Sequence, residues 1–386
     1  MMWRDGVVSE VLKRWGDKGK GCQILSVTIT QAPDNAVAFL PGTQVQALSY
    51  EHLIGPVTEG DAVRIEVSAL DRSLGTGGQA MVSALLTRLP LDDSDEGRMV
   101  KCRYMPTQVT TIGEDERDDD FRQLMASGRA LRTVPVIAAD LHSALPAIIT
   151  GMRAPLPHEQ QDDVPLPRVA YIMTDGGALP AAYSQTAQRL RDEGWIDDII
   201  TTGQAWGGTL ETVTVHNAIL AAVDRGADMI VVCQGPGNLG TETPWGYSGV
   251  AVSHDLQAAA LVGTTPMMCA RASQADARER HQGLSHHTAR IITDLLTVDC
   301  PMPLPKRRDD SDPFTHLLWE KAERACATSR ARGHVSLEPV PCDGLDRALR
   351  QCPVTLRTMG RGLDADYLSF LTAACAGRYA RNQWLA

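Results

Sequence analysis

The stretch RASQADARERHQGLSHHT, residues 271–288, gathers many charged and histidine side chains into one short segment. The apolar run at 265–270, directly before it, has the composition of a buried strand. The run at 289–296, directly after it, has helical apolar spacing, and Ser285 is a good N-cap residue for that helix. The sequence therefore predicts a loop that leaves the carboxyl end of a strand and enters a helix, which is where open α/β sheets bind ligands.

Three histidines of this loop, His281, His286 and His287, stand within seven positions. A helix N-terminus disfavours protonated imidazole, and neutral imidazole is the form that ligates a metal or acts as a base. We therefore predict these histidines to be catalytic and to bind a divalent metal, zinc or manganese. The spacing matches no standard metal motif, however, and neighbouring side chains on a helix point about 100° apart.

Arg278, Arg280 and Ser285 are candidate ligand-binding residues of the same loop. Two guanidinium groups can clamp a phosphate or carboxylate, and a helix N-terminus adds free N–H groups. The alternative is that these side chains hold the loop together through internal salt bridges and caps, because structural ion-pair networks resemble functional sites.

Strand and helix patterns alternate through the middle of the chain. Strands are predicted at 134–138, 168–173, 198–201, 229–233 and 265–270, and helices at 141–152, 179–193, 210–224 and 248–261. Such alternation is typical of a doubly wound parallel sheet with right-handed crossovers. The fold class is therefore α/β.

Polar and glycine residues follow the ends of these strands. They are Asp140 and His142 after the first, Asp175, Gly176 and Gly177 after the second, and Gly235, Gly237 and Gly240 after the fourth. Because the carboxyl ends of parallel strands share one edge of a sheet, we expect one ligand site there. We assign Asp175 as a catalytic carboxylate and the others to ligand binding. The alternatives are helix caps for both aspartates and a surface position for the histidine.

The glycine loop after the fourth strand reads GPGNLGTETPWG, residues 235–246. Its first six residues match the spacing G-x-G-x-x-G, but Pro236 and the long continuation before the next helix do not fit a dinucleotide-binding turn. We expect this loop to approach a ligand through backbone N–H groups.

The first part of the chain, residues 1–110, is rich in short strand patterns such as 23–29, 36–40 and 63–67, with one more strand predicted at 99–104. It predicts a small β-barrel of the SH3-like or OB type, with a packing or assembly role. The glycine-rich stretch LGTGG at 74–78 is interpreted as a tight turn. Residues 111–132 form an acidic linker with a short helix, in which 114–120 is expected to be a solvated loop. The α/β sheet domain then spans 133–305, and 306–386 is a C-terminal helical extension with helices at 314–330, 344–350 and 365–376.

The composition of the chain limits the classes of binding partner and the cellular compartment that we expect. The net charge is −10 and only 5% of residues are aromatic, so a nucleic-acid surface is not expected. No apolar run approaches the ~20 residues of a membrane span, and no signal peptide is recognisable. Nine cysteines without a C-x-x-C pair indicate reduced thiols. We expect a cytoplasmic protein that forms a homo-oligomer.

Several motifs resemble a bacterial family catalogued as domain of unknown function 3866. They are LGTGG at 74–78, KCRYMPTQ at 101–108, residues 134–143, YIMTDGGALP, GPGNLGTETPWGYSG, DARERHQGLSHHT and Met359-Gly360-Arg361. The resemblance extends over essentially the whole chain and implies this architecture. It carries no activity, substrate or cofactor. Asp175, Gly176, Gly177 and residues 281–288 lie on its motifs.

The functional prediction is a hydrolase or group-transfer enzyme that acts on a small anionic metabolite at the carboxyl edge of the parallel sheet. The alternative is a non-enzymatic ligand-sensing or scaffolding protein, in which the barrel and the helical extension build an oligomer.

Overall fold

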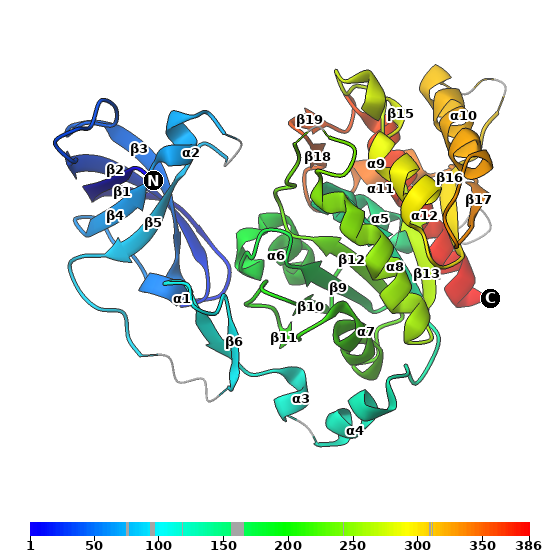
Figure 1. The fold of residues 1–386 in the computed structure, drawn as a ribbon, viewed down its shortest axis with the longest axis horizontal. Helices are drawn as coiled ribbons and strands as arrows, with labels where there is room; N and C mark the ends of the chain where they lie inside the picture. Colours follow the sequence, from blue (N-terminus) through cyan, green and yellow to red (C-terminus); the bar gives the residue numbers. More distant parts are fainter. Residues whose placement is uncertain are drawn as a thin grey trace. The chain divides into compact units, whose positions relative to one another are not determined.

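The computed structural model describes residues 1–74, 77–92, 97–117, 119–155, 166–241, 243–308, 310 and 312–386 (Figure 1). The chain divides into two compact units. The first consists of Met1–Glu96, Val100–Thr111 and Ala182–Gln188. The second consists of Gly97–Met99, Ile112–Ala181 and Arg189–Ala386.

Five strands of the first unit close into a barrel in the order β1-β2-β3-β5-β4. Their bounds are Trp3–Trp15 (β1), Cys22–Gln31 (β2), Gln44–Tyr50 (β3), Ala62–Glu66 (β4) and Ala80–Leu85 (β5). Neighbouring strands are antiparallel except β3 and β5, which are parallel. Alternate side chains such as Leu25, Val27 and Ile29 point inward and are buried, as a closed barrel requires. The predicted small β-barrel is confirmed.

Two details of the barrel region differ from the sequence prediction. Residues 36–40 form a loop between β2 and β3, whose backbone carbonyls accept hydrogen bonds from the buried Arg4 side chain. The segment near residue 100 forms a strand, but it pairs outside the barrel in a two-stranded sheet of β6 (Met99–Lys101) and β7 (Val109–Thr111). Gly75 and Thr76 of the predicted glycine turn lie outside the described residues. Short helices α1 (Glu51–Ile54) and α2 (Ser68–Asp71) complete the unit.

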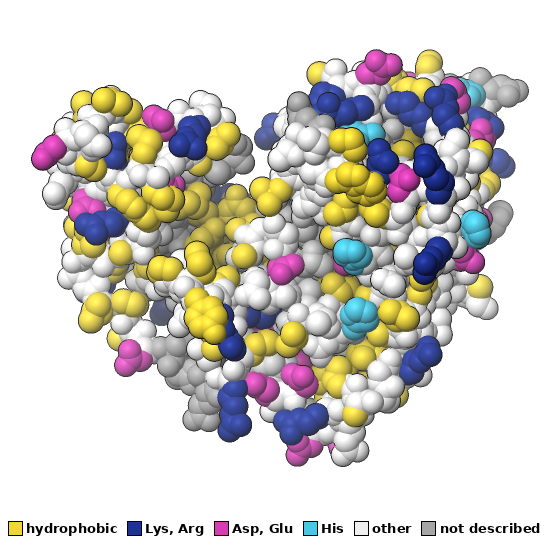
Figure 2. Space-filling model, in the orientation of Figure 1, with side chains coloured by type: hydrophobic (Ala, Val, Ile, Leu, Met, Phe, Trp, Pro, Cys, Tyr) yellow, Lys and Arg dark blue, Asp and Glu magenta, His cyan; other side chains and the backbone are white. Residues whose placement is uncertain are grey.

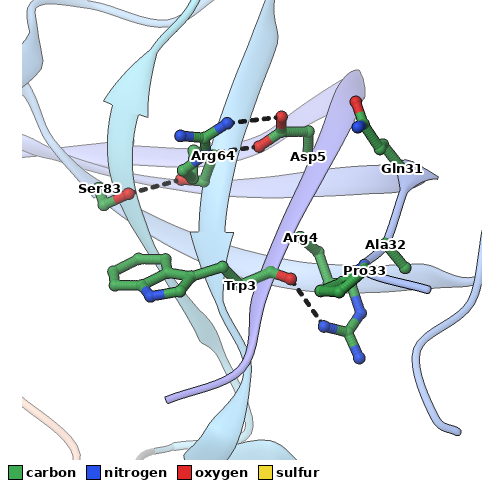
Figure 3. Close-up of a pocket in the computed structure, with 8 residues that line it drawn as sticks. All are labelled: Trp3, Arg4, Asp5, Gln31, Ala32, Pro33, Arg64 and Ser83. Atoms are coloured by element: carbon green, nitrogen blue, oxygen red, sulfur yellow. Dashed lines mark hydrogen bonds and ion pairs between the residues drawn. The ribbon is translucent and has the colours of Figure 1, made fainter. Parts of the chain in front are cut away.

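One pocket of about 450 Å³ lies on the barrel (Figure 3). It is lined by Trp3, Arg4, Asp5, Gln31, Ala32, Pro33, Arg64 and Ser83. Arg64 and Asp5 form a bidentate ion pair across it, with N–O distances of 2.7 and 2.8 Å. Their charges are therefore already satisfied by each other.

Helices α3 (Glu114–Arg117) and α4 (Asp119–Ser127) lead into the second unit. The sequence predicted a solvated loop at residues 114–120. Instead, Glu114 is buried and Phe121 inserts into the core beside the sheet, so this acidic segment is partly helical. The apolar face of α4 explains the difference, because burial of one phenylalanine contributes about 1.5–3 kcal/mol.

Six parallel strands of the second unit form a sheet in the order β11-β10-β9-β12-β8-β13. Their bounds are Pro135–Ala139 (β8), Val169–Thr174 (β9), Asp198–Thr201 (β10), Leu210–Glu211 (β11), Met229–Gln234 (β12) and Thr265–Cys269 (β13). The predicted parallel sheet is confirmed. The predicted helix at 210–224 is wrong in its first residues, because Leu210 and Glu211 pair with β10 as an edge strand.

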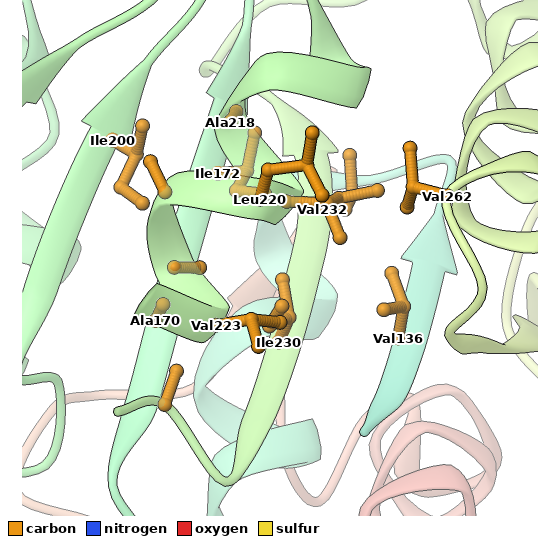
Figure 4. Close-up of a cluster of buried hydrophobic side chains, with 14 of the residues drawn as sticks. Val136, Ala170, Ile172, Ile200, Ala218, Leu220, Val223, Ile230, Val232 and Val262 are labelled. Atoms are coloured by element: carbon orange, nitrogen blue, oxygen red, sulfur yellow. The ribbon is translucent and has the colours of Figure 1, made fainter. Parts of the chain in front are cut away.

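Helices cover both faces of this sheet (Figure 1). Helices α7 (Val215–Asp224) and α8 (Val252–Leu261) pack on one face, where Val136, Ile172, Val232 and their neighbours build a continuous apolar core (Figure 4). Helices α5 (Leu145–Arg153) and α12 (Tyr367–Leu385) pack against each other on the opposite face. Helix α6 (Gln185–Asp192) follows β9. Strands covered on both faces read as unbroken apolar runs, which is why the sequence revealed them.

The C-terminal part is helical as predicted but also contains strands. Its helices are α10 (Pro313–Ala327), α11 (Leu345–Arg350) and α12, and its strands are β16 (Cys300–Pro305), β17 (Val335–Val340), β18 (Arg357–Thr358) and β19 (Arg361–Gly362). Strands β16 and β17 pair in parallel beside β13 and α12. All nine cysteines are free thiols, as predicted. Within the described ranges, none of the helices combines the length and the apolarity needed to cross a membrane.

Candidate functional site

The loop after β13 is a short ribbon closed by two small strands. Strand β14 (Ala272–Ser273) pairs with β15 (Gly283–Leu284), and Ser285 then caps α9 (His286–Arg290). The Ser285 hydroxyl accepts the backbone N–H of His287 at 3.2 Å, so the predicted N-cap is confirmed. Helix α9 continues into a π-helical turn, Ile291–Leu295. The loop therefore presents its side chains at the carboxyl edge of the sheet.

His281, His286 and His287 come together at the base of this ribbon. Each offers one ring nitrogen, and the three nitrogens lie within 4.8 Å of one another. The ring centroids are 4.8 Å apart for His281 and His286, 5.1 Å for His281 and His287, and 4.5 Å for His286 and His287. The ring planes are inclined by 55–77°, so the rings meet edge to face and are not stacked. Although His286 and His287 are neighbours at the start of a helix, their rings lie close together.

Asp140, directly after β8, contacts the histidine cluster through its carboxyl group. Its Oδ2 atom is 2.8 Å from Nη1 of Arg271 and 2.9 Å from Nδ1 of His287. Its Oδ1 atom accepts a hydrogen bond of 2.9 Å from the side-chain amide of Asn238. Gln234 donates to the Asp140 backbone carbonyl at 3.2 Å. The carboxyl group follows β8 and is thus held by side chains that follow its two neighbours in the sheet, β12 and β13.

The Asp140 carboxyl group remains ionised. Burial acts to raise its pKa, but the hydrogen bond from His287 and the charge of Arg271 outweigh burial, and the pKa lies below its ordinary value. An ionised carboxylate only accepts hydrogen bonds, so the 2.9 Å contact is a hydrogen bond when Nδ1 of His287 carries the proton, and Nε2 then has the lone pair. Nη1 of Arg271 also lies 3.0 Å from this Nδ1.

His281 and His286 are neutral at pH 7. Burial, followed by the charge of Arg271, lowers the pKa of His281 to about 3. Burial, followed by the charge of His287, lowers the pKa of His286 to about 4. The hydroxyl of Ser285 lies 2.7 Å from Nδ1 of His281 and fixes the orientation of that ring. These two rings therefore offer imidazole lone pairs and not imidazolium protons.

Tyr247 covers one side of the cluster. Its ring stacks on His287 with a centroid distance of 3.7 Å and an interplanar angle of 12°, and its hydroxyl donates to the His287 carbonyl at 3.2 Å. Trp245, two residues earlier, is 57% exposed, with the Arg290 guanidinium 5.1 Å from its ring centroid. The loop after β12 thus supplies both an aromatic wall and Asn238.

The predicted arginine clamp is only partly available to a ligand. Arg278 forms a bidentate ion pair with the buried Asp276, with both N–O distances at 2.9 Å. This pairing, despite burial, holds the pKa of the Asp276 carboxyl well below its usual range. Arg280 is exposed, and its charge acts on His286. The alternative of an internal salt bridge therefore describes Arg278.

The structure does not bring Asp175 or His142 into the cluster. Asp175 is exposed at the end of β9, which β12 separates from β8, and its Oδ2 accepts the backbone N–H of Gln204 at 3.2 Å. His142 is buried, and its Nδ1 lies 3.1 Å from the Tyr171 hydroxyl. Burial lowers the pKa of His142 to about 4, as expected for a neutral packing histidine.

The predicted glycines serve packing and turns. A Cβ atom on Gly176 would lie 2.2 Å from Oε1 of Gln234, and one on Gly235 would lie 2.5 Å from Cε of Met173. Gly237 has a φ of +100°, which only glycine adopts readily. Gly240 pairs with Tyr247 in an isolated bridge, and Gly177 packs beside Leu179. The loop after β12 contacts the site through the side chains of Asn238 and Tyr247.

The sequence prediction missed Arg271, Asn238 and Tyr247. Arg271 is the first charged residue after the apolar run of β13, so its position at a strand end was a usable signal. Asn238 and Tyr247 stand within the glycine loop and carry no local pattern, because their role depends on how that loop folds against β8 and α9.

The comparisons with known proteins agree with the predicted resemblance. A search of curated proteins finds no match. The family model described as "Protein of unknown function (DUF3866)" matches residues 46–377, a range that includes every residue of the histidine cluster and its Asp140 anchor. Because this match covers most of the sequence, the chain belongs to the DUF3866 family.

Proposed function

We propose that this protein is a hydrolase or group-transfer enzyme that acts on a small anionic metabolite at the carboxyl edge of the parallel sheet. One observation carries the proposal: the Asp140 carboxylate contacts His287 at Nδ1, beside the two neutral histidines His281 and His286. An oriented neutral imidazole is the group that most often activates water or a hydroxyl group for attack.

The chemistry follows from the roles of the two partners. Asp140 fixes the ring orientation and the tautomer of His287, and it would stabilise positive charge that develops on that ring. Asn238 and Arg271 in turn keep the carboxylate in place. Nε2 of His287 is thereby left free to activate a nucleophile. Because the carboxylate is buried, the orientation it imposes is strong.

Positive charge near the cluster supports an anionic substrate. Arg280 is exposed and its charge acts on His286, whereas the charge of Arg271 is offset by Asp140. Figure 2 shows Lys and Arg side chains gathered over the part where Figure 1 places β15, α9 and α10. The chain as a whole has a net charge of −10, so this basic region contrasts with the rest. A basic region attracts anionic ligands of small size.

The alternative is a cytoplasmic ligand sensor that works as a homo-oligomer. The pairing of Arg271 with Asp140 and of Arg278 with Asp276 supports it, because both cations nearest the histidines already have partners within the chain. In that case a ligand would bind without being converted.

A substrate screen distinguishes the enzyme from the ligand sensor. The full chain is assayed against chromogenic phosphate monoesters and carboxylic esters, together with Asp140→Asn and the control Asp224→Asn, which changes an exposed aspartate at the end of α7. Loss of the orienting carboxylate should lower kcat/KM at least 100-fold, whereas the control should match the wild type. Folding of each variant is checked by circular dichroism.

Turnover that persists in folded Asp140→Asn contradicts the assignment of this site. Thermal stabilisation by anions without any product favours the sensor.

A further inference from the structure

The geometry of the three imidazoles is close to that of a metal site. Three nitrogens bound at about 2.05 Å to one tetrahedral zinc ion lie roughly 3.4 Å apart, and their ring centroids lie roughly 5 Å apart. The observed centroid distances are 4.5, 4.8 and 5.1 Å. The nitrogens lie within 4.8 Å of one another, so small side-chain rotations would bring them to one ion.

The groups behind the rings have the arrangement found around metal ligands. A metal-bound histidine usually donates its second ring N–H to a carboxylate or another acceptor, which fixes the ring and makes the ligand more basic. Nδ1 of His287 contacts the Asp140 carboxylate at 2.9 Å, and Nδ1 of His281 contacts the Ser285 hydroxyl at 2.7 Å. In both rings Nε2 is left for the ion.

Carboxylates offset part of the positive charge around the cluster. Arg271 is paired with Asp140, and Arg278 with Asp276, and both carboxylates are buried next to their partners. Each carboxylate reduces the repulsion that its arginine exerts on a cation at the cluster. Arg280 is exposed, where solvent and salt screen it.

We infer that His281, His286 and His287 bind one divalent transition-metal ion, with zinc as the first choice. Imidazole nitrogen suits zinc, copper and nickel, whereas magnesium and calcium prefer oxygen ligands that this cluster does not offer. Three protein ligands leave a fourth position for water or a substrate atom, which is the pattern of catalytic and not of structural zinc sites. The inference goes beyond the proposed function, because an ion can bind here whether or not the protein catalyses a reaction.

The test measures metal directly on the full chain. Tag-free protein purified without chelator is analysed by mass spectrometry, then stripped and titrated with Zn²⁺ against a chromophoric chelator and with Co²⁺ by visible absorption. The wild type should bind about one equivalent and give the intense visible bands of tetrahedral Co²⁺. The half-buried His286 is the first ligand to change, because His286→Ala is the variant least disruptive to folding.

Two comparisons decide the outcome. His286→Ala should weaken Zn²⁺ binding at least 100-fold, and Asp140→Asn should weaken it about 10–100-fold through the loss of ring orientation. The control His254→Ala, on an exposed position of α8, should bind Zn²⁺ like the wild type. Folded wild type that takes up less than about 0.1 equivalent, or His286→Ala that binds as tightly as the wild type, overturns the inference.

Activity assays on the same samples separate the two proposals. Turnover by stripped protein that binds no Zn²⁺ would overturn the metal site and leave the proposed function standing. Stoichiometric Zn²⁺ without turnover of any substrate would confirm the metal site and count against the proposed function.

Discussion

Asp255 lies in the first turn of α8 with only 5% of its surface exposed. Its carboxyl group makes no side-chain hydrogen bond to any residue within the described part of the chain. Burial, followed by repulsion from Asp175, raises its pKa to about 7. A carboxyl group with a raised pKa holds its proton in the folded state at a pH where the unfolded chain has lost it. Folding is therefore penalised as the pH rises.

Asp255→Asn should remove this penalty. In the wild type, the free energy of unfolding falls between the unfolded pKa near 4 and the folded pKa near 7. The variant should equal the wild type at pH 4 and exceed it by about 2–4 kcal/mol above pH 7. Chemical denaturation at pH 4, 6 and 8 measures the difference, with Asp224→Asn as the exposed control. A difference that does not change with pH would show that Asp255 is not protonated in the folded state.

At the residue scale, the sequence indicated the three histidines but not most of the side chains that contact them. His281, His286 and His287 were predicted together because they stand close in the sequence. The anchor Asp140 lies 131 positions before Arg271, and its selection needed only the strand-end rule. The same rule also selected Asp175, which lies on the other side of β12. The order of the strands in the sheet determines which of the two aspartates lies beside the histidines. That order depends on contacts between residues far apart in the sequence, which local sequence patterns do not show.

Glycines set the close approach of α5 and α12. A Cβ atom on Gly151 of α5 would lie 2.0 Å from the backbone oxygen of Ala374, and one on Gly377 of α12 would lie 1.8 Å from that of Ile148. Both contacts are with backbone, which cannot rotate away as a side chain can. Alanine at either position would have to push the two helices apart.

Gly151→Ala and Gly377→Ala should each lower the free energy of unfolding by about 2 kcal/mol. The cost of overpacking, about 1–3 kcal/mol or more, exceeds the gain of about 1 kcal/mol from better helix propensity. The control Gly362→Ala, where a new Cβ meets nothing within 4 Å, should change stability by less than about 0.5 kcal/mol. Denaturant titration measures all three.

The double variant of Gly151 and Gly377 adds a second check. Once one alanine has separated the helices, the second should cost less. The double variant should therefore lose less unfolding free energy than the sum of the two single losses. Full additivity would mean that the two glycines do not share one contact.

At the element scale, fully buried strands were the easiest to predict. Residues 198–201 were placed without error, and the other long strands of the sheet within one residue at each end, because apolar runs covered on both faces have no competing pattern. The errors occur where a segment is short or at an edge. Leu210 and Glu211 continue the apolar spacing of α7, and only their pairing with β10 makes them a strand. Residues 36–40 alternate like a strand but have no partner in the barrel order.

At the scale of the whole molecule, the two units contain carboxyl groups that respond to pH in opposite ways. Burial of Asp61 in the barrel is outweighed by hydrogen bonds from Arg88, Thr58 and Thr87, which lower its pKa to about 2. A lowered folded pKa contributes stability that is present above the unfolded pKa near 4 and is lost as the pH falls towards 2. Asp255 in the sheet unit has the reverse dependence.

Asp61→Asn should therefore destabilise the full chain by about 1–2 kcal/mol at pH 7, and this loss should vanish as the pH approaches 2. Asp255→Asn should stabilise it at pH 7 and have no effect at pH 4. Because the two residues belong to different compact units, the effects in the double variant should add within about 0.5 kcal/mol at each pH. Calorimetry of the wild type, both single variants and the double variant at pH 3, 5 and 8 tests this. A double variant that departs clearly from the sum would mean that the two sites are energetically coupled although they belong to different units, and would contradict this prediction.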